Sequence, residues 1–259
     1  MTPGHALVVA AAGFLAGGVN AIAGGGTLIS FPALLAAGTG AKLANITSSV
    51  GLISGYAGGS VAYRAELAGQ GRRFYLLAGV SVVGGVGGAV LLLATPGGSF
   101  RAVVPFLILA SCVLLAAQPG LARRLAERHA RRPSPDGRDA KEMGWGGRLG
   151  AGVSAVYGSY FGAGLGVLLL AVLGVVLDDD LQRLNALKGL LSLIINVSGV
   201  LVFLIAGRVA WQYAGILAVT AFAGGTAGVR VARRLSAAAL RTGVIVLGVG
   251  VAIGLFVTR

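Results

Sequence analysis

The sequence predicts an all-α integral membrane protein built from two inverted repeats. Each repeat is a glycine-broken helical hairpin that re-enters the membrane, followed by three transmembrane helices. Composition, a series of long apolar runs and matched residues in the two halves lead to this fold class. Of 259 residues, 56% are hydrophobic and only 11% are charged, with a mean hydropathy of +0.88. A soluble domain carries about 25% charged residues. Too few charges therefore remain to coat a soluble fold of this size.

The apolar runs are long enough to cross a bilayer. A hydrocarbon core about 30 Å thick needs about 20 residues of helix. The first run has no Lys or Arg before it, so we expect mature structure from Ala6 onward rather than a cleaved signal peptide. The apolar segments are 6–38, 44–63, 74–95, 101–117, 149–177, 184–206, 211–229 and 241–257.

The one long hydrophilic connection falls near the middle of the chain, where turn-forming residues surround a cluster of basic side chains. It divides the chain into a first membrane repeat (1–117), a basic cytoplasmic loop (118–148) and a second membrane repeat (149–259). The basic residues of the loop are Arg123, Arg124, Arg128, Arg131, Arg132, Arg138, Lys141 and Arg148.

Matching residues in the two halves indicate a tandem duplication. A single glycine match means little in a chain with 45 glycines. Several matches in the same order, at nearly the same offset, are hard to obtain by chance. At an offset of 140, Asn45 matches Asn185, Gly84–Gly88 matches Gly224–Gly228, and Arg101 matches Arg241. At an offset of 138, Gly24 and Gly26 match Gly162 and Gly164.

The first apolar segment of each half is long and interrupted by glycines. Segment 6–38 contains Gly24-Gly25-Gly26, and its counterpart contains Gly162-Ala163-Gly164. Irregular backbone at membrane depth is tolerated only where protein or a water-filled cavity surrounds it. Each segment is therefore either a full crossing or a hairpin that leaves the membrane on the side where it entered.

The distribution of charge favours hairpins. With the central loop inside, eight full crossings would place the cluster Arg230–Arg241 outside, against the bias of basic residues toward cytoplasmic loops. Hairpins give each half three crossings and invert the second half relative to the first. Only Lys42, Arg101, Arg208 and Arg259 then lie outside. Inverted repeats with discontinuous helices recur among transporters.

The formal net charge of +13 does not indicate nucleic-acid binding. The basic residues lie in short loops between apolar runs, without the interleaved aromatic and polar residues of a base-reading surface. The lone Cys112 lies in an apolar run and is expected to be a small buried hydrophobe. His5 and His129 have no metal-ligand spacing, so we expect no metal and no cofactor.

The broken segments suit anions. Backbone N–H groups at a helix N-terminus carry roughly half a positive charge and point at whatever lies there. Gly26 and Thr27 begin the outgoing helix of the first hairpin, and Gly164 begins that of the second. Two such ends meeting near the midplane would hold an oxyanion without a charged side chain. The alternative is that the glycines only allow close packing, which we prefer for Gly84 and Gly88 and their counterparts.

A series of motifs runs through nearly the whole chain: Gly17…Asn20…Gly24-Gly25-Gly26, then Pro32, then Asn45…Thr47-Ser48-Ser49 and, in the second half, Asn185…Lys188. In these motifs the chain resembles the TauE/SafE family of sulfite and organosulfonate exporters. The resemblance implies transport of small sulfur-containing or carboxylated anions such as sulfite or sulfoacetate. Tyr157, Tyr160 and Phe161 make the second hairpin bulkier than the family pattern.

Lys188 lies within an otherwise apolar helix, where a charge costs at least about 2.5 kcal/mol and usually has a task or a partner. It either attracts the anion or extends to the nearby membrane face, where Asp178–Asp180 could pair with it. Uncharged polar residues could bind substrate oxygens or only tie helices together. The expected substrate-binding residues are Asn20, Gly24, Gly25, Gly26, Thr27, Ser48, Ser49, Tyr160, Gly162, Gly164, Asn185, Lys188 and Asn196.

A membrane enzyme and a channel are the rival classes. Asp178–Asp180 lacks a second carboxylate cluster or histidine set, and is better explained as capping the helix that begins near Leu181. The duplicated hairpins favour a carrier over a channel. No Asp or Glu lies within any apolar segment, so export driven by the membrane potential is expected, with ion-coupled uptake as the alternative.

These expectations place the chain in the plasma (inner) membrane of a prokaryote. It is expected to be multi-pass, with the central loop cytoplasmic. The partners are the lipid bilayer and a small anion, and no nucleic acid. The sequence leaves a homodimer open.

Overall fold

The computed structural model describes residues 2–22, 24–131, 144–177, 179–232 and 237–257, and all of its regular structure in these ranges is helical. Several residues of the charge argument lie outside the described residues, namely Arg132, Arg138, Lys141, Asp178, Arg233, Arg234 and Arg259. The helices are α1 (Pro3–Ile22), α2 (Thr27–Ala36), α3 (Ala41–Ala62), α4 (Gly71–Ala94), α5 (Gly97–Arg131), α6 (Trp145–Tyr160), α7 (Leu165–Val176), α8 (Leu181–Ala206), α9 (Trp211–Ala232) and α10 (Ala237–Val257).

The all-helical prediction is confirmed, and both expected breaks are present. Among the described helices, α1, α4, α5 and α8 are each long and apolar enough to cross a membrane. The break between α1 and α2 falls at the first glycine cluster, and that between α6 and α7 at the second. One boundary differs from expectation, because α5 does not end with the apolar run at residue 117 but continues to Arg131.

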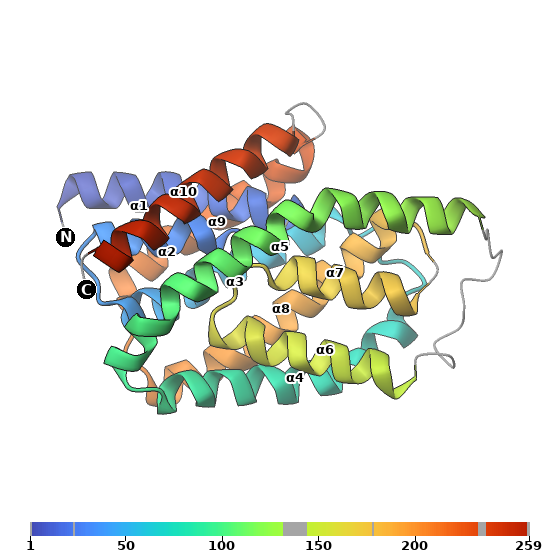
Figure 1. Ribbon diagram of the computed structural model, residues 1–259, viewed down its shortest axis with the longest axis horizontal. Coiled ribbons are helices and arrows are strands. Elements are labelled where there is room, and N and C mark those ends of the chain that lie inside the picture. Colours follow the sequence, from blue (N-terminus) through green and yellow to red (C-terminus); the bar gives the residue numbers. More distant parts are fainter. Residues whose placement is uncertain (1, 23, 132–143, 178, 233–236, 258–259) are drawn as a thin grey trace.

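The two hairpins open toward opposite ends of the helix bundle. Figure 1 shows the outer ends of α1 and α2 at the end that carries both chain termini. The outer ends of α6 and α7 lie at the other end, where α3 meets α4 and where α5 projects. Both turns between paired helices therefore lie inside the bundle.

Helix packing follows the same pattern in the two halves. If α1 to α5 are matched in order with α6 to α10, then α1 packs on α9 as α6 packs on α4. Likewise α3 packs on α9 as α8 packs on α4, and α2 on α10 as α7 on α5. The pairs α3 with α8 and α5 with α10 are their own counterparts. Two copies related by a twofold axis produce contacts of this kind.

The small-residue pairs in α4 and α9 serve close packing. A Cβ on Gly84 or Gly88 would meet the backbone of α6, and one on Gly224 would meet the backbone of α1 at Phe14. Backbones approach this closely only where side chains are absent. The packing interpretation of these glycines is confirmed.

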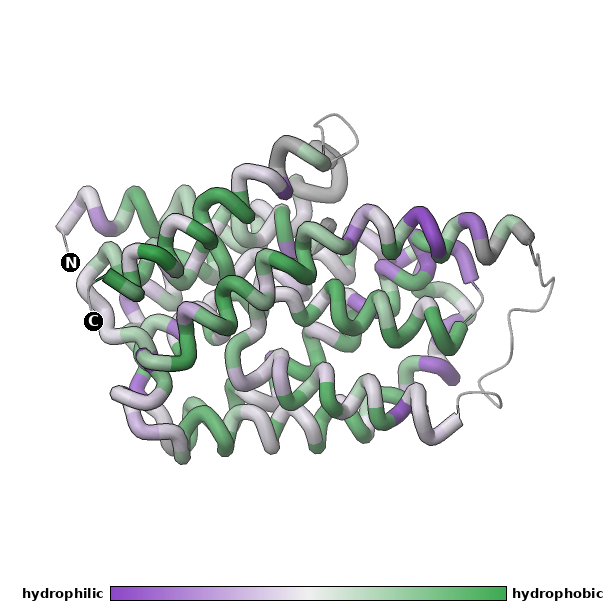
Figure 2. The backbone as a smooth tube through the Cα atoms, in the orientation of Figure 1, coloured by the Kyte–Doolittle hydropathy of each residue, from purple (hydrophilic) through white to green (hydrophobic). Residues whose placement is uncertain are grey.

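Polar side chains tie the loops together at the end where α8 begins. Asp179 accepts hydrogen bonds from Arg73 of α4 and from Arg183 of α8, the latter at 3.1 Å. Gln70 donates to the Arg183 carbonyl at 2.9 Å. Asp180 caps α8 by accepting from the Gln182 N–H at 2.8 Å, so the expected helix cap is confirmed. Figure 2 shows hydrophilic residues gathered at this end, including the projecting part of α5.

The Asp179 contacts predict a stability that depends on pH. Burial pushes the pKa of Asp179 upward, but hydrogen bonds from Arg73, the Asp180 N–H and Arg183 outweigh it, so the pKa lies below its ordinary 3.8. A depressed carboxyl pKa adds stability that is complete above pH 3.8 and is lost as pH falls through the folded value. Asp179→Asn should lower the free energy of unfolding by about 1.5–3 kcal/mol near neutral pH.

Unfolding in detergent at a series of pH values checks this. The difference between the parent and Asp179→Asn should shrink as pH drops below about 4, where the unfolded-state carboxyl of the parent also becomes protonated. A difference that stays constant down to pH 2 would show that the charge of Asp179 contributes nothing.

Candidate functional site

The tips of the two hairpins, residues 24–27 and 161–166, touch inside the bundle. Gly24, Gly162 and Gly164 have φ angles of +78°, +84° and +80°, a region that favours glycine. The backbone of Gly24 lies against that of Gly166, so close that a Cβ on Gly24 would stand 2.5 Å from the Gly166 Cα. The glycine clusters thus serve both to turn the chain and to let the tips meet.

Side chains continue the contact between the tips. The rings of Phe31 in α2 and Phe161 in the second tip pack edge to face, with centroids 5.7 Å apart. The amide nitrogen of Asn45 in α3 donates to the carbonyl of Tyr160 at 2.9 Å. The second tip is therefore held both by its own hairpin and by the first half of the chain.

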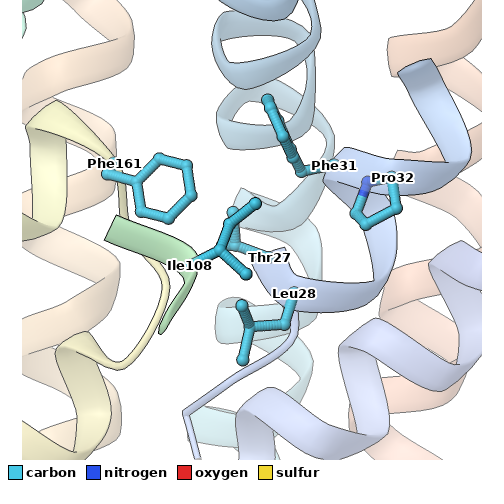
Figure 3. A pocket seen from close by; sticks show the side chains of 6 residues that line it. All are labelled: Thr27, Leu28, Phe31, Pro32, Ile108 and Phe161. Carbon is cyan, nitrogen blue, oxygen red and sulfur yellow. The ribbon is translucent and has the colours of Figure 1, made fainter. Parts of the chain in front are cut away.

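A small pocket lies where α2 faces the second tip. Figure 3 shows its six lining side chains, with Phe31 and Phe161 approaching one another across it and Thr27 among them. Thr27 is the one lining residue with a polar side chain. The lining residues are Thr27, Leu28, Phe31, Pro32, Ile108 and Phe161.

Asn20 caps the start of α2. Its Oδ1 accepts from the N–H of Gly26 at 2.7 Å, although the two residues are six positions apart. The carboxamide lies directly against Gly26, where an added Cβ would stand 2.8 Å from the Asn20 Nδ2. Asn20 is only 4% exposed, and within the described residues its Nδ2 has no hydrogen-bond partner. The Gly26 backbone N–H, which was expected to face the substrate, is thus already bonded to Asn20. The Nδ2 of Asn20 is the donor that remains beside it.

Tyr56 is a further buried polar residue at this centre. Its hydroxyl lies beside the side chains of Asn20 and Asn196, so α1, α3 and α8 each contribute one polar group. Sequence reasoning missed Tyr56, although the repeat offset of 140 pairs it with Asn196. The two residues therefore occupy matched positions on α3 and α8, which pack on each other. Because tyrosine and asparagine differ in size and chemistry, this pair could not be recognised as a repeat match from the sequence.

The second tip presents a carbonyl that is already satisfied. Ala163 O accepts from the Tyr157 hydroxyl at 2.7 Å and from Ser111 Oγ of α5 at 2.9 Å. The two hydroxyls also lie 2.8 Å apart. Tyr157, one of the bulky residues of this hairpin, thus satisfies the Ala163 carbonyl, whose oxygen would otherwise repel an anion.

The hydroxyls expected on α3 have different surroundings. Ser48 Oγ lies 2.6 Å from Ser30 Oγ, which links α3 to α2 just beyond the tip. Ser49 instead donates to the Asn45 carbonyl in its own helix at 3.0 Å. Ser48 therefore belongs to the surroundings of the first tip, whereas Ser49 satisfies only its own backbone.

Lys188 is buried rather than extended to the membrane face. It is 2% exposed, and its Nζ donates to Asn185 Oδ1 at 2.9 Å. Of the three carboxylates expected near it, Asp179 binds Arg73 and Arg183, Asp180 caps α8, and Asp178 lies outside the described residues. Eight residues of α8 separate Lys188 from Asn196, which at 1.5 Å per residue is about 12 Å.

The structure thus brings most of the predicted residues together but not all. Gly25 faces Leu115 of α5, with its nearest approach from a built Cβ at 3.4 Å. Ser49 donates to its own backbone and Asn185 accepts from Lys188, so these three are left out of the group defined next. We call the remainder, with Tyr56 added, the tip site: Asn20, Gly24, Gly26, Thr27, Ser48, Tyr56, Tyr160, Gly162, Gly164 and Asn196.

Comparison with known proteins shows the family of this chain. The family described as "Sulfite exporter TauE/SafE" matches residues 9–255, which is nearly the whole length. The chain belongs to the TauE/SafE family. No solved structure matches it.

Relatives of this TauE/SafE protein carry transporter names. It is 24% identical over 220 residues to "Probable membrane transporter protein YfcA" of Escherichia coli K12, covering 83% of this chain and 76% of that one. A "Probable membrane transporter protein" of Haemophilus influenzae is 23% identical, covering 91% and 88%. "Probable membrane transporter protein ORF9" of a Sinorhizobium species is 27% identical, covering 94% and 89%. The chain is a multi-pass membrane protein of a transporter family.

Proposed function

We propose that this TauE/SafE protein exports a small sulfur-containing or carboxylated anion, such as sulfite or sulfoacetate, and that the anion binds at the tip site. The observation that carries the proposal is the buried Nδ2 of Asn20, which makes no hydrogen bond of good geometry among the described residues, although the Tyr56 hydroxyl lies beside this side chain. Leaving such a donor unpaired costs about 1–3 kcal/mol. A substrate oxygen that accepts from it would recover this energy.

The surroundings of Asn20 suit an anion that is bound without a neighbouring countercharge. The dipole of α2 points its positive end at the tip, and the first-turn Thr27 adds a hydroxyl to the pocket. The Asn196 Nδ2 already donates to the Ser192 carbonyl at 2.9 Å, which leaves its second N–H and the Tyr56 hydroxyl as further groups that can donate. Neutral donors release their ligand more readily than an ion pair would, which a carrier needs.

The driving force proposed is the membrane potential. No Asp or Glu lies within the apolar segments, so a carboxylate proton relay has no support. An inside-negative potential favours outward movement of an anion by about 2.3 kcal/mol per charge per 100 mV. Export therefore needs no coupling ion.

For the architecture, we propose two inverted repeats, 1–117 and 149–259, around a cytoplasmic loop in the inner membrane of a prokaryote. The hairpins that open toward opposite ends and the matched packing pairs support this. The basic residues Arg64, Arg72, Arg73 and Arg183 lie around loops at the end from which α8 begins. The positive-inside rule makes that end cytoplasmic. A carrier is preferred over a channel because the tips touch and, among the described residues, enclose a small apolar pocket.

Flux in proteoliposomes held at a set voltage tests the proposal. Sulfite, sulfoacetate, thiosulfate and a small carboxylate are compared one at a time. We expect at least one to move with a rate that rises as the voltage favours its direction. If the parent protein moves none of them at any voltage, the proposal is wrong for this substrate class.

A further inference from the structure

The peptide that precedes the outgoing helix is oriented differently in the two hairpin tips. At the repeat offset of 138, the Gly25–Gly26 peptide of the first tip corresponds to the Ala163–Gly164 peptide of the second. The Gly25 carbonyl accepts from the Leu28 N–H at 3.0 Å, so it points along α2. The Gly26 N–H points the other way and donates back to α1.

In the second tip, two hydroxyl groups hold the corresponding carbonyl. The Ala163 carbonyl accepts from the Tyr157 hydroxyl of α6 at 2.7 Å and from Ser111 Oγ of α5 at 2.9 Å. Among the described residues, no hydrogen bond joins it to the N–H of Gly166, which is the counterpart of Leu28. The carbonyl therefore points back toward α5 and α6 rather than along its own outgoing helix α7.

The first hairpin has no counterpart of these two hydroxyls. At the offset of 138, Val19 of α1 stands where α6 has Tyr157. At the offset of 140, Val251 of α10 stands where α5 has Ser111. Because a valine side chain cannot donate to a carbonyl, the difference in sequence between the halves coincides with the difference in peptide orientation.

The orientation of the carbonyl also fixes that of the next N–H. A trans peptide plane carries its C=O and its N–H on opposite sides, and none of the described peptide bonds is cis. The Gly164 N–H therefore faces away from α5 and α6. Gly164 is the N-cap of α7, and among the described residues its N–H makes no hydrogen bond. The Leu165 side chain lies back against α6, which is the side of the carbonyl.

The first hairpin lies against the second tip on sides that these hydroxyls do not occupy. A Cβ built on Gly162 would stand 3.3 Å from Thr27 Oγ1. The backbone of Gly166 touches that of Gly24. A ligand held between the tips is thus within the region that the uncapped end of α7 faces.

We propose that Ser111 and Tyr157 are positioning residues for anion binding. By holding the Ala163 carbonyl, they aim the Gly164 N–H at the tip site, where it donates to the anion. The positive end of the α7 dipole favours the same ligand. The first hairpin then supplies a side-chain donor, Asn20 Nδ2, and the second a backbone donor. The inference rests on the proposed anion transport and names a further donor of its site.

Anion flux in proteoliposomes, measured over a range of anion concentrations at a set voltage, tests the two hydroxyls. The anions are sulfite, sulfoacetate and thiosulfate. Ser111→Ala and Tyr157→Phe each leave one hydroxyl that can hold the Ala163 carbonyl, so each alone should raise KM only slightly. The double variant frees the peptide and should raise KM about tenfold or more, as expected for one hydrogen bond to a charged group. The maximal flux should change much less than KM.

Two further variants distinguish positioning from a purely structural role. Ser154→Ala removes a buried hydroxyl of α6 that donates to the Gly150 carbonyl of its own helix at 2.7 Å, and it should leave KM unchanged. Ser111→Thr in the Tyr157→Phe background keeps one hydroxyl and should keep KM low. If the double variant loses thermal stability but has the KM of the parent, the proposal is wrong.

The amide of Gly164 provides a second measurement that needs no variant. Labelling alanine with carbonyl ¹³C and glycine with ¹⁵N selects the amides of glycines that follow an alanine, which include Gly164 and Gly152 of α6. A saturating concentration of the transported anion should move the Gly164 amide proton resonance downfield and leave that of Gly152 in place. An unmoved Gly164 resonance in a protein that transports the anion would overturn this inference alone. A parent without any anion flux would overturn it together with the proposed function.

Discussion

Gly24→Ala is expected to prevent the hairpin tips from meeting. Gly24 has a φ of +78°, which costs an alanine about 1–2 kcal/mol. The new Cβ would also stand 2.5 Å from the Gly166 Cα, a backbone atom that no rotamer change can move. Both effects act on the contact that positions the tip site. We expect little folded protein and no transport from what folds, measured as monodisperse yield in detergent and as anion flux.

The neighbouring Gly25→Ala is the matched control for folding. Gly25 has no positive φ, and its added Cβ would lie 3.4 Å from the Leu115 Cδ2, an ordinary contact with a flexible side chain. Its folded yield should stay close to that of the parent. Equal yields for Gly24→Ala and Gly25→Ala would mean that the tips do not need to touch.

Asn20→Asp should abolish transport while the fold is retained. The carboxylate can still accept from the Gly26 N–H, so the start of α2 keeps its cap. The buried Nδ2 donor, however, is replaced by an oxygen that repels an anion. We expect the anion flux at a set voltage to fall at least about tenfold. The loss of one hydrogen bond and the addition of one like charge account for a change of this size.

Two further variants serve as comparisons for Asn20→Asp. Asn20→Ala removes the cap as well and should also lower thermal stability, by the cost of one unsatisfied N–H, about 1–3 kcal/mol. Thr226→Ala removes a hydroxyl that only bonds carbonyls in its own helix α9, and should leave flux unchanged. Normal flux in Asn20→Asp would exclude a role for the Asn20 amide in anion binding.

The breaks in the hairpins could be predicted because their cause is local. Three consecutive glycines at 24–26 disfavour a helix whatever surrounds them. The end of α5 could not be predicted in this way. Beyond residue 117 the apolar run stops and Pro119-Gly120 disfavours a helix, yet α5 continues through it. The Leu, Ala and Arg residues that follow are good helix formers, and Arg123 lies 3.4 Å from Glu127 one turn later.

The candidate site was predicted in part for a related reason. Asn20 and the glycines carry a local signal, a polar group beside broken backbone. Tyr56 carries no such local signal, because its place in the site becomes clear only once the structure shows its repeat partner Asn196 beside it. The bond from Asn20 to Gly26 depends on a turn that periodicity does not describe.

Protection of a cysteine in the pocket by the substrate tests the location of binding most directly. Thr27→Cys in a Cys112→Ala background is labelled with a small thiol reagent in proteoliposomes, with and without the transported anion. Thr27 lines the pocket between the tips, whereas Gly98→Cys at the exposed start of α5 serves as the reference. We predict that saturating anion slows labelling at position 27 several-fold and leaves position 98 unchanged. Equal labelling rates at position 27 with and without the anion would contradict a binding site between the hairpin tips.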